Sequence, residues 1–202
     1  MTEKSKNYNI AAVILAGGNA RRLGGIAKGT IEINNGVSII DKLIKELVKA
    51  DINNIVISAN DSKPYQDYGV QIIPDINVGI GPIAGIESGL KHFADQSDAV
   101  MFIPCDMPNI TAKEILALKD AFIKTKASAV FAKTADFLWH PLCAVAHGNL
   151  KKEISSAIEH GQRKIRGFWQ QVNAMAVQFS DETVFLNINN PTDMNRWQGA
   201  EN

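Results

Sequence analysis

Glycine and basic residues gather in a short stretch directly after the first apolar run of the chain. The run covers residues 10–15, and the stretch then contains Gly17-Gly18, Arg21-Arg22, Gly24-Gly25 and Lys28. Glycine lets the main chain approach a bulky ligand closely, and backbone amides supported by cationic side chains bind phosphate oxygens. This pattern indicates a loop for the triphosphate of a nucleotide, although a glycine-rich sequence after a strand is often only a tight turn.

A second candidate for chemistry is Asp106, which follows another apolar run at residues 99–103. Pro104 and Pro108 flank the acid and stiffen its loop. Magnesium prefers carboxylate, phosphate and water oxygens, so one carboxylate here could hold the ion that neutralises a triphosphate under attack. The alternative is that Asp106 only caps or orders a turn.

Two common phosphate motifs do not fit the glycine-rich stretch. Lys28 precedes Gly29 instead of following a glycine, so Gly-x-x-x-x-Gly-Lys-Ser/Thr is absent, and the stretch contains no Gly-x-Gly-x-x-Gly. Gly79-x-Gly81 lies elsewhere, but no strand immediately precedes it and Pro82 follows it. These features argue against a P-loop kinase and against a dinucleotide-binding dehydrogenase.

The candidate residues must be positioned by an alternating series of strands and helices. Six apolar residues in a row at 10–15 are typical of a strand buried on both faces of a parallel sheet. Further strands are expected at 30–33, 54–58, 70–73, 99–103 and 127–132. Helices are expected after Ser38, at 83–93, and after a Thr111–Glu114 capping box. The alternation predicts a parallel sheet with helices on both faces, in one domain over residues 10–202 behind a flexible tail at 1–9.

In such a sheet the ligand lies beyond the carboxyl ends of the strands. Ser58 and Asn60 follow one expected strand, Asp75 follows the next, and Asp106 follows a third. We therefore expect these residues and the glycine-rich loop to meet around one crevice, with the glycine-rich segment 79–85 beside them.

Composition limits the partners. The chain has 202 residues, 46% of them hydrophobic, with 21 basic and 21 acidic side chains and a pI near 6.9. This balance gives no electrostatic reason to expect nucleic acid or an anionic membrane. No apolar run approaches the roughly twenty residues of a membrane helix. Cys105 and Cys143 lie far apart without a zinc-type pattern, which favours a reducing, cytoplasmic setting.

Several segments resemble one enzyme family. The segment Leu15-Ala16-Gly17-Gly18-x-x-Arg21-Arg22-Leu23-Gly24-Gly25-x-x-Lys28-Gly29 resembles the signature of nucleotidyltransferases, and most closely the molybdenum cofactor guanylyltransferase family, also called molybdopterin-guanine dinucleotide biosynthesis protein A. Cys105-Asp106-Met107-Pro108 is similar to its Cys-Asp-x-Pro metal-binding segment, and Gly81–Gly85 to its Gly-Pro-Leu-Ala-Gly segment. His140-Pro141 and Asn187–Pro191 resemble segments on the cofactor side of the cleft, so the matches cover nearly the whole chain.

The resemblance implies a three-layer αβα fold with a mostly parallel, Rossmann-like sheet of the nucleotide-diphospho-sugar transferase type. It implies transfer of GMP from Mg-GTP to the phosphate of molybdopterin, with release of pyrophosphate. Magnesium would be the cofactor, GTP and molybdopterin the ligands, and molybdoenzyme maturation proteins candidate partners. Neither nucleic acid nor a membrane is implied.

The resemblance also assigns site residues. Nucleotide contacts are expected at Leu15, Ala16, Gly17, Gly18, Lys28, Ser58, Asp75, Gly81 and Asp106. Catalytic roles are expected for Lys28 and Arg22 on the phosphates and for Asp106 on the metal. Substrate contacts are expected at His140, Asn187 and Asn189. A hydrogen-bonded structural role is the alternative for His140, and the basic segment 163–166 has a solvated helix start as its default interpretation.

Two positions depart from the family pattern. Ala27 stands where an aspartate usually precedes the lysine, and Ser58 stands where an asparagine is common, with Asn60 as a substitute nearby. A serine hydroxyl has fewer hydrogen-bonding groups than an amide. Two alternatives therefore stay open: a cytidylyl- or sugar-phosphate nucleotidyltransferase on the same fold, and a nucleotide-binding module with impaired turnover.

Overall fold

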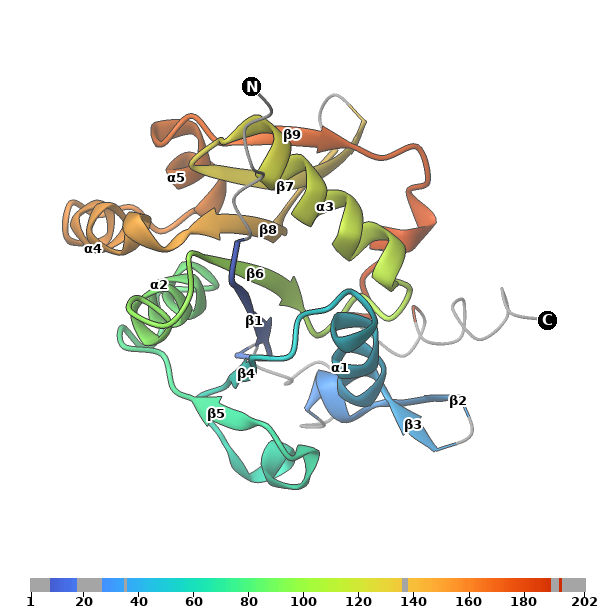
Figure 1. The fold of residues 1–202 in the computed structure, drawn as a ribbon. Coiled ribbons are helices and arrows are strands. Elements are labelled where there is room, and N and C mark those ends of the chain that lie inside the picture. Colours follow the sequence, from blue (N-terminus) through green and yellow to red (C-terminus); the bar gives the residue numbers. More distant parts are fainter. Residues whose placement is uncertain (1–7, 18–26, 35, 136–137, 190–192, 194–202) are drawn as a thin grey trace.

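The computed structural model describes residues 8–17, 27–34, 36–135, 138–189 and 193. A seven-stranded sheet forms its centre, with the strand order β5-β4-β1-β6-β8-β7-β9 (Figure 1). The strands of this sheet are β1 (Ile10–Leu15), β4 (Ile55–Ser58), β5 (Gln71–Ile73), β6 (Ala99–Pro104), β7 (Ala129–Ala135), β8 (Leu138–His147) and β9 (Met175–Gln178). A separate hairpin consists of β2 (Glu32–Asn34) and β3 (Val37–Ser38).

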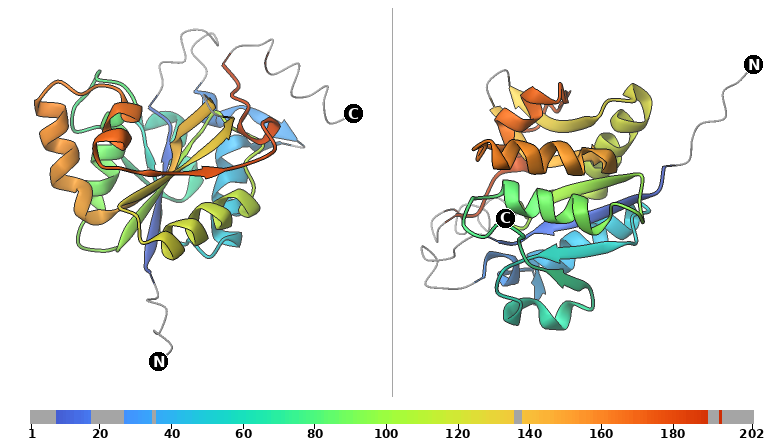
Figure 2. Two further views of the ribbon diagram at one scale, coloured as in Figure 1. Left: turned by 90° about the horizontal axis from the view of Figure 1, so that it is seen from above. Right: turned by 90° about the vertical axis from the view of Figure 1, so that its left-hand side faces the viewer.

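Helices cover both faces of the sheet. The α-helices are α1 (Ile39–Lys49), α2 (Ile83–His92), α3 (Ala112–Thr125), α4 (Lys151–Glu159) and α5 (Ile165–Gln171). The 3₁₀ helices are η2 (Lys28–Thr30), η3 (Lys63–Tyr68), η4 (Gly148–Leu150) and η5 (Thr183–Phe185). Helices α1 and α3 share one apolar core with the sheet, whereas α2, α4 and α5 share the other (Figures 1 and 2). The expected three-layer αβα architecture is confirmed.

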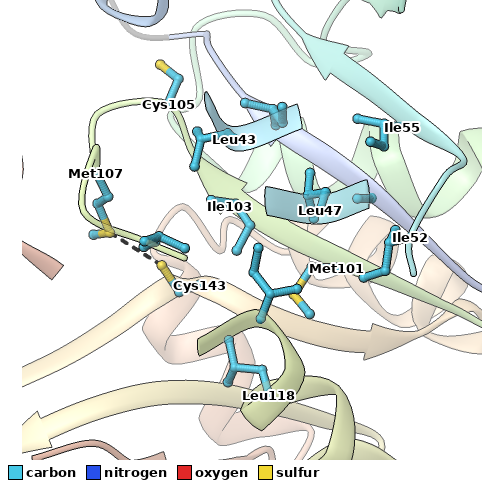
Figure 3. Packing of buried hydrophobic residues seen from close by; sticks show 14 of the residues in the cluster. Leu43, Leu47, Ile52, Ile55, Met101, Ile103, Cys105, Met107, Leu118 and Cys143 are labelled. Atoms are coloured by element: carbon cyan, nitrogen blue, oxygen red, sulfur yellow. Dashed lines mark hydrogen bonds between the residues drawn. The ribbon is translucent and has the colours of Figure 1, made fainter. Parts of the chain in front are cut away.

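Strand β1 contributes to both cores, which explains its unbroken apolar sequence. Ala12 and Ile14 point into the core beneath α1 and α3, and Val13 and Leu15 point into the core beneath α2. Figure 3 shows the first core, where Leu43 and Leu47 of α1 lie beside Met101 and Ile103 of β6. The strand pairs in parallel with β4 on one side and β6 on the other. A central parallel strand has no solvent face, so it needs apolar residues at every position.

Strand β8, like β9, is not among the strands that sequence patterning predicted. It pairs antiparallel with both β6 and β7. Only two residues separate it from β7, and a parallel return would need a connection of roughly a dozen residues. The expectation of a parallel sheet from the alternation is therefore wrong at this strand, while a mostly parallel sheet is confirmed.

Pro141 lies within β8 at a change in register. Phe131 pairs with Ala144, but the next residue of β7, Ala132, pairs with His140. Such bulges accommodate proline, which has no N–H for the ladder. The carbonyl of Pro141 accepts a hydrogen bond of 2.8 Å from the Trp169 indole, which joins the bulge to α5.

Helix starts agree with the expected capping signals, and smaller differences occur elsewhere. Ser38 with Asp41 and Thr111 with Glu114 both form capping boxes. The strand expected at 30–33 is replaced by η2 followed by β2, and the strand expected at 127–132 is β7, which starts and ends later. The asparagine at position 9, which the sequence places in the tail, donates its backbone N–H to Asp98 at 3.0 Å. Across the described residues, no helix has the length and apolar character needed to cross a membrane.

Candidate active site at the carboxyl edge of the sheet

The ends of β4, β1 and β6 lie next to one another at one edge of the sheet. Leu15, the last residue of β1, is paired with Ser58 on one side and Pro104 on the other. From β1 the chain moves outward to β4 and β5, and then returns to the opposite side of β1 as β6. This reversal is the switch point at which open α/β sheets bind ligands. The strand order therefore brings the expected residues to one place.

Lys28, Asp106 and Asn189 form the first polar group at this edge. The Lys28 ammonium lies 3.1 Å from Asp106 Oδ2 and donates a second hydrogen bond of 2.6 Å to Asn189 Oδ1. The lysine and aspartate side chains are 18% and 20% exposed, so both charges remain accessible from solvent. A cation and an anion held this close match the two parts of a metal–triphosphate, because the lysine can contact phosphate and the carboxylate can contact the metal.

The position of Lys28 depends on the glycine that follows it. A Cβ at Gly29 would lie 2.6 Å from Ile40 Cγ1 and 3.2 Å from Tyr65 Cε1. Without a side chain, η2 fits closely against α1 and Tyr65, and Lys28 at its start reaches the sheet edge. Ala27, the residue that replaces the family's aspartate, packs against the core on the same side. Its carbonyl accepts a hydrogen bond of 2.8 Å from the Thr30 hydroxyl.

The turn that carries Asp106 is held from two directions. The Asp106 carbonyl accepts a 2.8 Å hydrogen bond from the Ile188 amide. The Cys143 thiol donates to the Met107 thioether at 3.4 Å (Figure 3). Burial, together with the nearby Asp106 charge, raises the pKa of Cys105 to about 12. The thiol is therefore neutral at physiological pH and is not a nucleophile.

Asp75 and its partners form the second polar group. Asp75 accepts hydrogen bonds from Ser58 Oγ at 3.2 Å and from Asn60 Nδ2 at 2.8 Å, while its own amide donates to Asn60 Oδ1 at 2.9 Å. Asn60 thus contacts this residue twice and Ser58 once. A Cβ on Gly17 would lie 3.6 Å from Asp75 Oδ2, which places the first residues after β1 beside the same carboxylate. Ala16 connects the groups along the edge, since its amide donates to the Ser58 carbonyl at 2.8 Å.

The start of α2 packs tightly against this second group. A Cβ at Gly85 would lie 2.8 Å from Leu15 Cδ2 and 3.0 Å from Ser58 Oγ. Gly81 has φ +89°, a conformation that side chains rarely adopt, and its carbonyl accepts the Ala84 amide at 3.1 Å. The glycines of this segment therefore bring the helix start close to Asp75 and let the chain turn into it.

The remaining expected residues divide into three cases. His140 is buried; its Nε2 lies 2.9 Å from Thr134 Oγ1 and its ring stacks on Phe185 at 4.4 Å. Burial lowers the pKa of His140, so the imidazole is neutral at pH 7. Asn187 is exposed, two residues before the asparagine that bonds to Lys28. Gly18 and Arg22 lie outside the described residues.

The basic segment 163–166 is partly occupied with structural contacts. Arg163 Nη1 donates to the Ile158 carbonyl at 2.7 Å, at the end of α4. The Arg166 guanidinium lies 4.1 Å above the Trp139 ring, a cation–π contact. Among the described residues no group of three or more histidine, cysteine or acidic side chains could hold a metal ion. A divalent ion at the site would thus use Asp106 with phosphate and water oxygens, a donor set that suits magnesium.

Sequence reasoning missed the contacts that join distant segments. It placed Asn189 on the acceptor side, and the structure puts its side chain on Lys28, 161 residues away. It named neither Tyr65, which supports Gly29, nor Asn77 and Glu87, which are bonded to each other at 2.6 Å. An available signal was Glu87, a charged residue among the mostly apolar or small residues of this helix.

Comparisons with known proteins find matches over most of the chain. A family model described as MobA-like NTP transferase domain matches residues 12–175. A protein named molybdenum cofactor guanylyltransferase from Yersinia pestis (strain Pestoides F) is 35% identical over 193 residues, which cover 94% of this chain and 95% of that protein. A protein of the same name from Yersinia pseudotuberculosis serotype O:1b is 34% identical over the same shares of both chains.

Solved structures show the same architecture. The crystal structure of molybdopterin-guanine dinucleotide biosynthesis protein A from Archaeoglobus fulgidus has a TM-score of 0.75 at 27% identity, covering 95% of this chain and 97% of that one. The 4-diphosphocytidyl-2C-methyl-D-erythritol synthase from Anaerococcus prevotii has a TM-score of 0.74 at 14% identity, covering 96% of both chains. At that identity the second likeness concerns the fold alone.

Proposed function

Because the chain belongs to the MobA-like NTP transferase family and is a nucleotidyltransferase, we propose that it transfers GMP from Mg-GTP to the phosphate of molybdopterin, forming molybdopterin guanine dinucleotide and pyrophosphate. The observation that carries this proposal is the 3.1 Å pair of Lys28 and Asp106 at the switch point of the sheet. The names of the relatives supply the acceptor and the base, and the local geometry supports the nucleotidyl-transfer chemistry.

The phosphates of the nucleotide lie between the first loop and Asp106. Leu15, Ala16, Gly17 and Gly18 approach with their main chain, and Lys28 and Arg22 neutralise the phosphate oxygens. Asp106 would hold a magnesium ion, which would supply charge neutralisation at the triphosphate. When the phosphate is bound, Lys28 turns from Asp106 towards it, and Asn189 remains as a hydrogen-bond acceptor for the ammonium.

The nucleoside lies towards the second polar group. Hydrogen bonds from Ser58 and Asn60 fix the direction of both carboxylate oxygens of Asp75. This side chain can therefore accept hydrogen bonds from donors on the base or the ribose. Gly81 lets the chain turn into α2, whose start packs beside Ser58. These neighbours support Asp75 as the residue that recognises the nucleoside.

The reaction needs no protein nucleophile. The acceptor phosphate is already anionic near neutral pH; one of its oxygens bonds to the α-phosphorus while the bond from that phosphorus to the bridging oxygen breaks. Pyrophosphate leaves with the electron pair. Lys28 and the arginines stabilise the charge that develops on the phosphates, and positioning supplies much of the rate. The acceptor side is assigned to His140 and Asn187, with the basic segment 163–166 available for the anionic pterin, whereas Asn189 contacts Lys28.

The direct test combines purified protein, Mg-GTP and a molybdopterin-bearing acceptor, and measures the guanine dinucleotide and pyrophosphate. We expect product with wild-type protein and none above background for Asp106→Asn. Absence of product beside an active guanylyltransferase control would contradict the proposal. Binding of GTP without pyrophosphate release would instead favour the impaired module, and recovery of turnover by Ala27→Asp would locate the loss at that residue.

The alternative base is tested separately. A thermal-shift series with the magnesium complexes of GTP, CTP, UTP and ATP measures which nucleotide stabilises the folded chain, because a ligand that binds only the folded state raises its stability. We expect the largest shift with GTP. A larger shift with CTP would favour a cytidylyltransferase. Cytoplasmic location and contacts with molybdoenzyme maturation proteins remain predictions.

A further inference from the structure

Glu87 is a buried carboxylate that the proposed chemistry does not use. It lies in the second turn of α2 and is 1% exposed. Its Oε1 accepts hydrogen bonds from Lys91 Nζ and Ser155 Oγ, both at 2.8 Å, and its Oε2 accepts from Asn77 Nδ2 at 2.6 Å. A carboxylate is expensive to bury unless it is paired and hydrogen-bonded. The position therefore needs a reason other than simple packing.

The contacts of Glu87 join three segments of the chain. Lys91 is on α2 itself, Ser155 is on α4, and Asn77 is in the loop that follows Asp75. Burial alone would raise the pKa of Glu87, but hydrogen bonds from Lys91, Ser155 and Asn77 outweigh burial and lower it. Glu87 is thus ionised at neutral pH, and its three donors act on a full negative charge, which strengthens each bond.

The loop after Asp75 is held to α2 at two successive residues. The Ile76 amide donates to Ser88 Oγ at 2.9 Å, and the next residue, Asn77, bonds to Glu87. Beyond them, Gly79 and Gly81 have φ +84° and +89°. Because glycine has no side chain, these two residues make no side-chain contact that would hold the loop in place. The Asp75 carboxylate must meet Ser58 at the end of β4 and Asn60 just after that strand. The direction of the Asp75 side chain therefore depends on the orientation of this loop.

We propose that Glu87 is a positioning residue of the nucleotide site: through Asn77 it fixes the loop of residues 76–81 against α2, and it thereby holds Asp75 in the direction that the nucleoside requires. Ser155 extends the same carboxylate contact to α4, on the side of the basic segment 163–166. The identity of the nucleotide in this inference rests on the proposed function, whereas the loop contact does not.

A matched control exists on the opposite face of the sheet. Glu46 on α1 is also buried, at 8% exposure, and is paired with a lysine of its own helix, Lys49, at 2.6 Å. Its other oxygen accepts the Ala112 amide at 2.7 Å. Glu46 therefore joins α1 to α3 in the way that Glu87 joins α2 to the loop, without contact to the Asp75 loop.

The experiment compares Asn77→Ala, Glu87→Gln and the control Glu46→Gln in two measurements. The first is amide hydrogen exchange of residues 76–81. We expect about tenfold faster exchange there in Asn77→Ala and Glu87→Gln, and wild-type exchange in Glu46→Gln, because only the first two variants weaken the charged hydrogen bond that holds this loop. Unchanged exchange in all three would overturn the inference.

The second measurement separates KM from kcat. We expect the KM for GTP to rise about five- to tenfold in Asn77→Ala and Glu87→Gln, with kcat and the KM for the acceptor within about twofold of wild type. An Asn77→Asp variant would bring two carboxylates together and should be worse than Asn77→Ala. Equal kinetic effects in the Glu46→Gln control would overturn the positioning role, since general loss of stability would then explain them.

Failure of the inference and failure of the proposed function give different results. A wild-type chain that binds no nucleoside triphosphate contradicts the proposed function, and hydrogen exchange still decides whether Glu87 holds the loop. A wild-type chain that forms product, with variants indistinguishable from the control, contradicts the inference alone.

Discussion

Asp106 and Asp75 lie at the same edge of the sheet, but their partners are of different kinds. Asp106 pairs with the ammonium of Lys28 at 3.1 Å, so its charge is balanced by a flexible cationic side chain. Asp75 is held by the neutral donors of Ser58 and Asn60. A charge balanced by a lysine can be exchanged for a metal ion while the lysine moves to phosphate. A charge held by neutral donors keeps both its sign and its direction, which suits recognition.

The largest test of this difference is the loss of the Asp106 charge. Asp106→Asn keeps the size of the side chain and an acceptor for Lys28, but it removes the proposed metal ligand. We expect kcat to fall about 10³-fold or more, because the metal contributes several kcal/mol to the transition state. The KM for GTP should change much less. Single-turnover kinetics at saturating Mg-GTP measure the effect, and a kcat within tenfold of wild type would place the metal elsewhere.

The corresponding change at the second carboxylate should affect binding instead of turnover. Asp75→Asn leaves Ser58 and Asn60 in place and removes the acceptor proposed for the donors of the nucleoside. We expect the KM for GTP to rise roughly tenfold or more with kcat largely retained, since a charged hydrogen bond is lost in both ground state and transition state. Steady-state kinetics give both constants. An equal fall in kcat would mean that the two carboxylates do not differ as described.

A smaller effect is expected at the second partner of Lys28. Asn189→Ala removes the acceptor at 2.6 Å and leaves Asp106 as the described partner of the ammonium. We expect kcat/KM for GTP to fall about five- to tenfold. Asn187→Ala is the neighbouring control, and it should act on the acceptor KM if it acts at all. Identical kinetic profiles for the two variants would argue against a role of Asn189 on Lys28.

His140 extends the comparison to a base held by a neutral hydroxyl. Its pKa is lowered from 6.5 by burial, so the unfolded chain takes up the proton more readily than the folded chain does. The contribution of neutral His140 to the stability of the folded chain is complete above the unfolded pKa of about 6.5. It is lost as the pH falls through the lower pKa of the folded chain. We expect the melting temperature of wild type to fall more steeply than that of His140→Gln below pH 6.5. Parallel curves would show that this imidazole is not shifted.

The part of the fold from β1 to β7 was largely predictable because its signals are local. A run of six apolar residues is typical of a strand buried on both faces, and the strand-end rule then placed Lys28 and Asp106 together. Asn60 could be named because it lies two residues after β4 and close to Ser58. The capping boxes at Ser38 and Thr111 fixed two helix starts within a residue.

The part of the fold after β7 and the contacts between distant segments were not predictable in the same way. Strand β8 contains a proline at a bulge, and proline within an apolar run argues against a strand unless the partner's register is known. The hydrogen bond from Lys28 to Asn189 and the bond from Asn77 to Glu87 depend on which segments fold together. No spacing rule connects side chains 161 residues apart.

The contact between Lys28 and Asn189 also orders events during synthesis on the ribosome. Lys28 and the strand before Asp106 leave the ribosome well before the segment with Ile188 and Asn189, because Asn189 lies 161 residues after Lys28. The amide of Ile188 holds the Asp106 turn and Asn189 holds the lysine. A nascent chain therefore carries the charges of Lys28 and Asp106 before the contacts that hold them can form, and a chain cut short before Ile188 would lack both contacts.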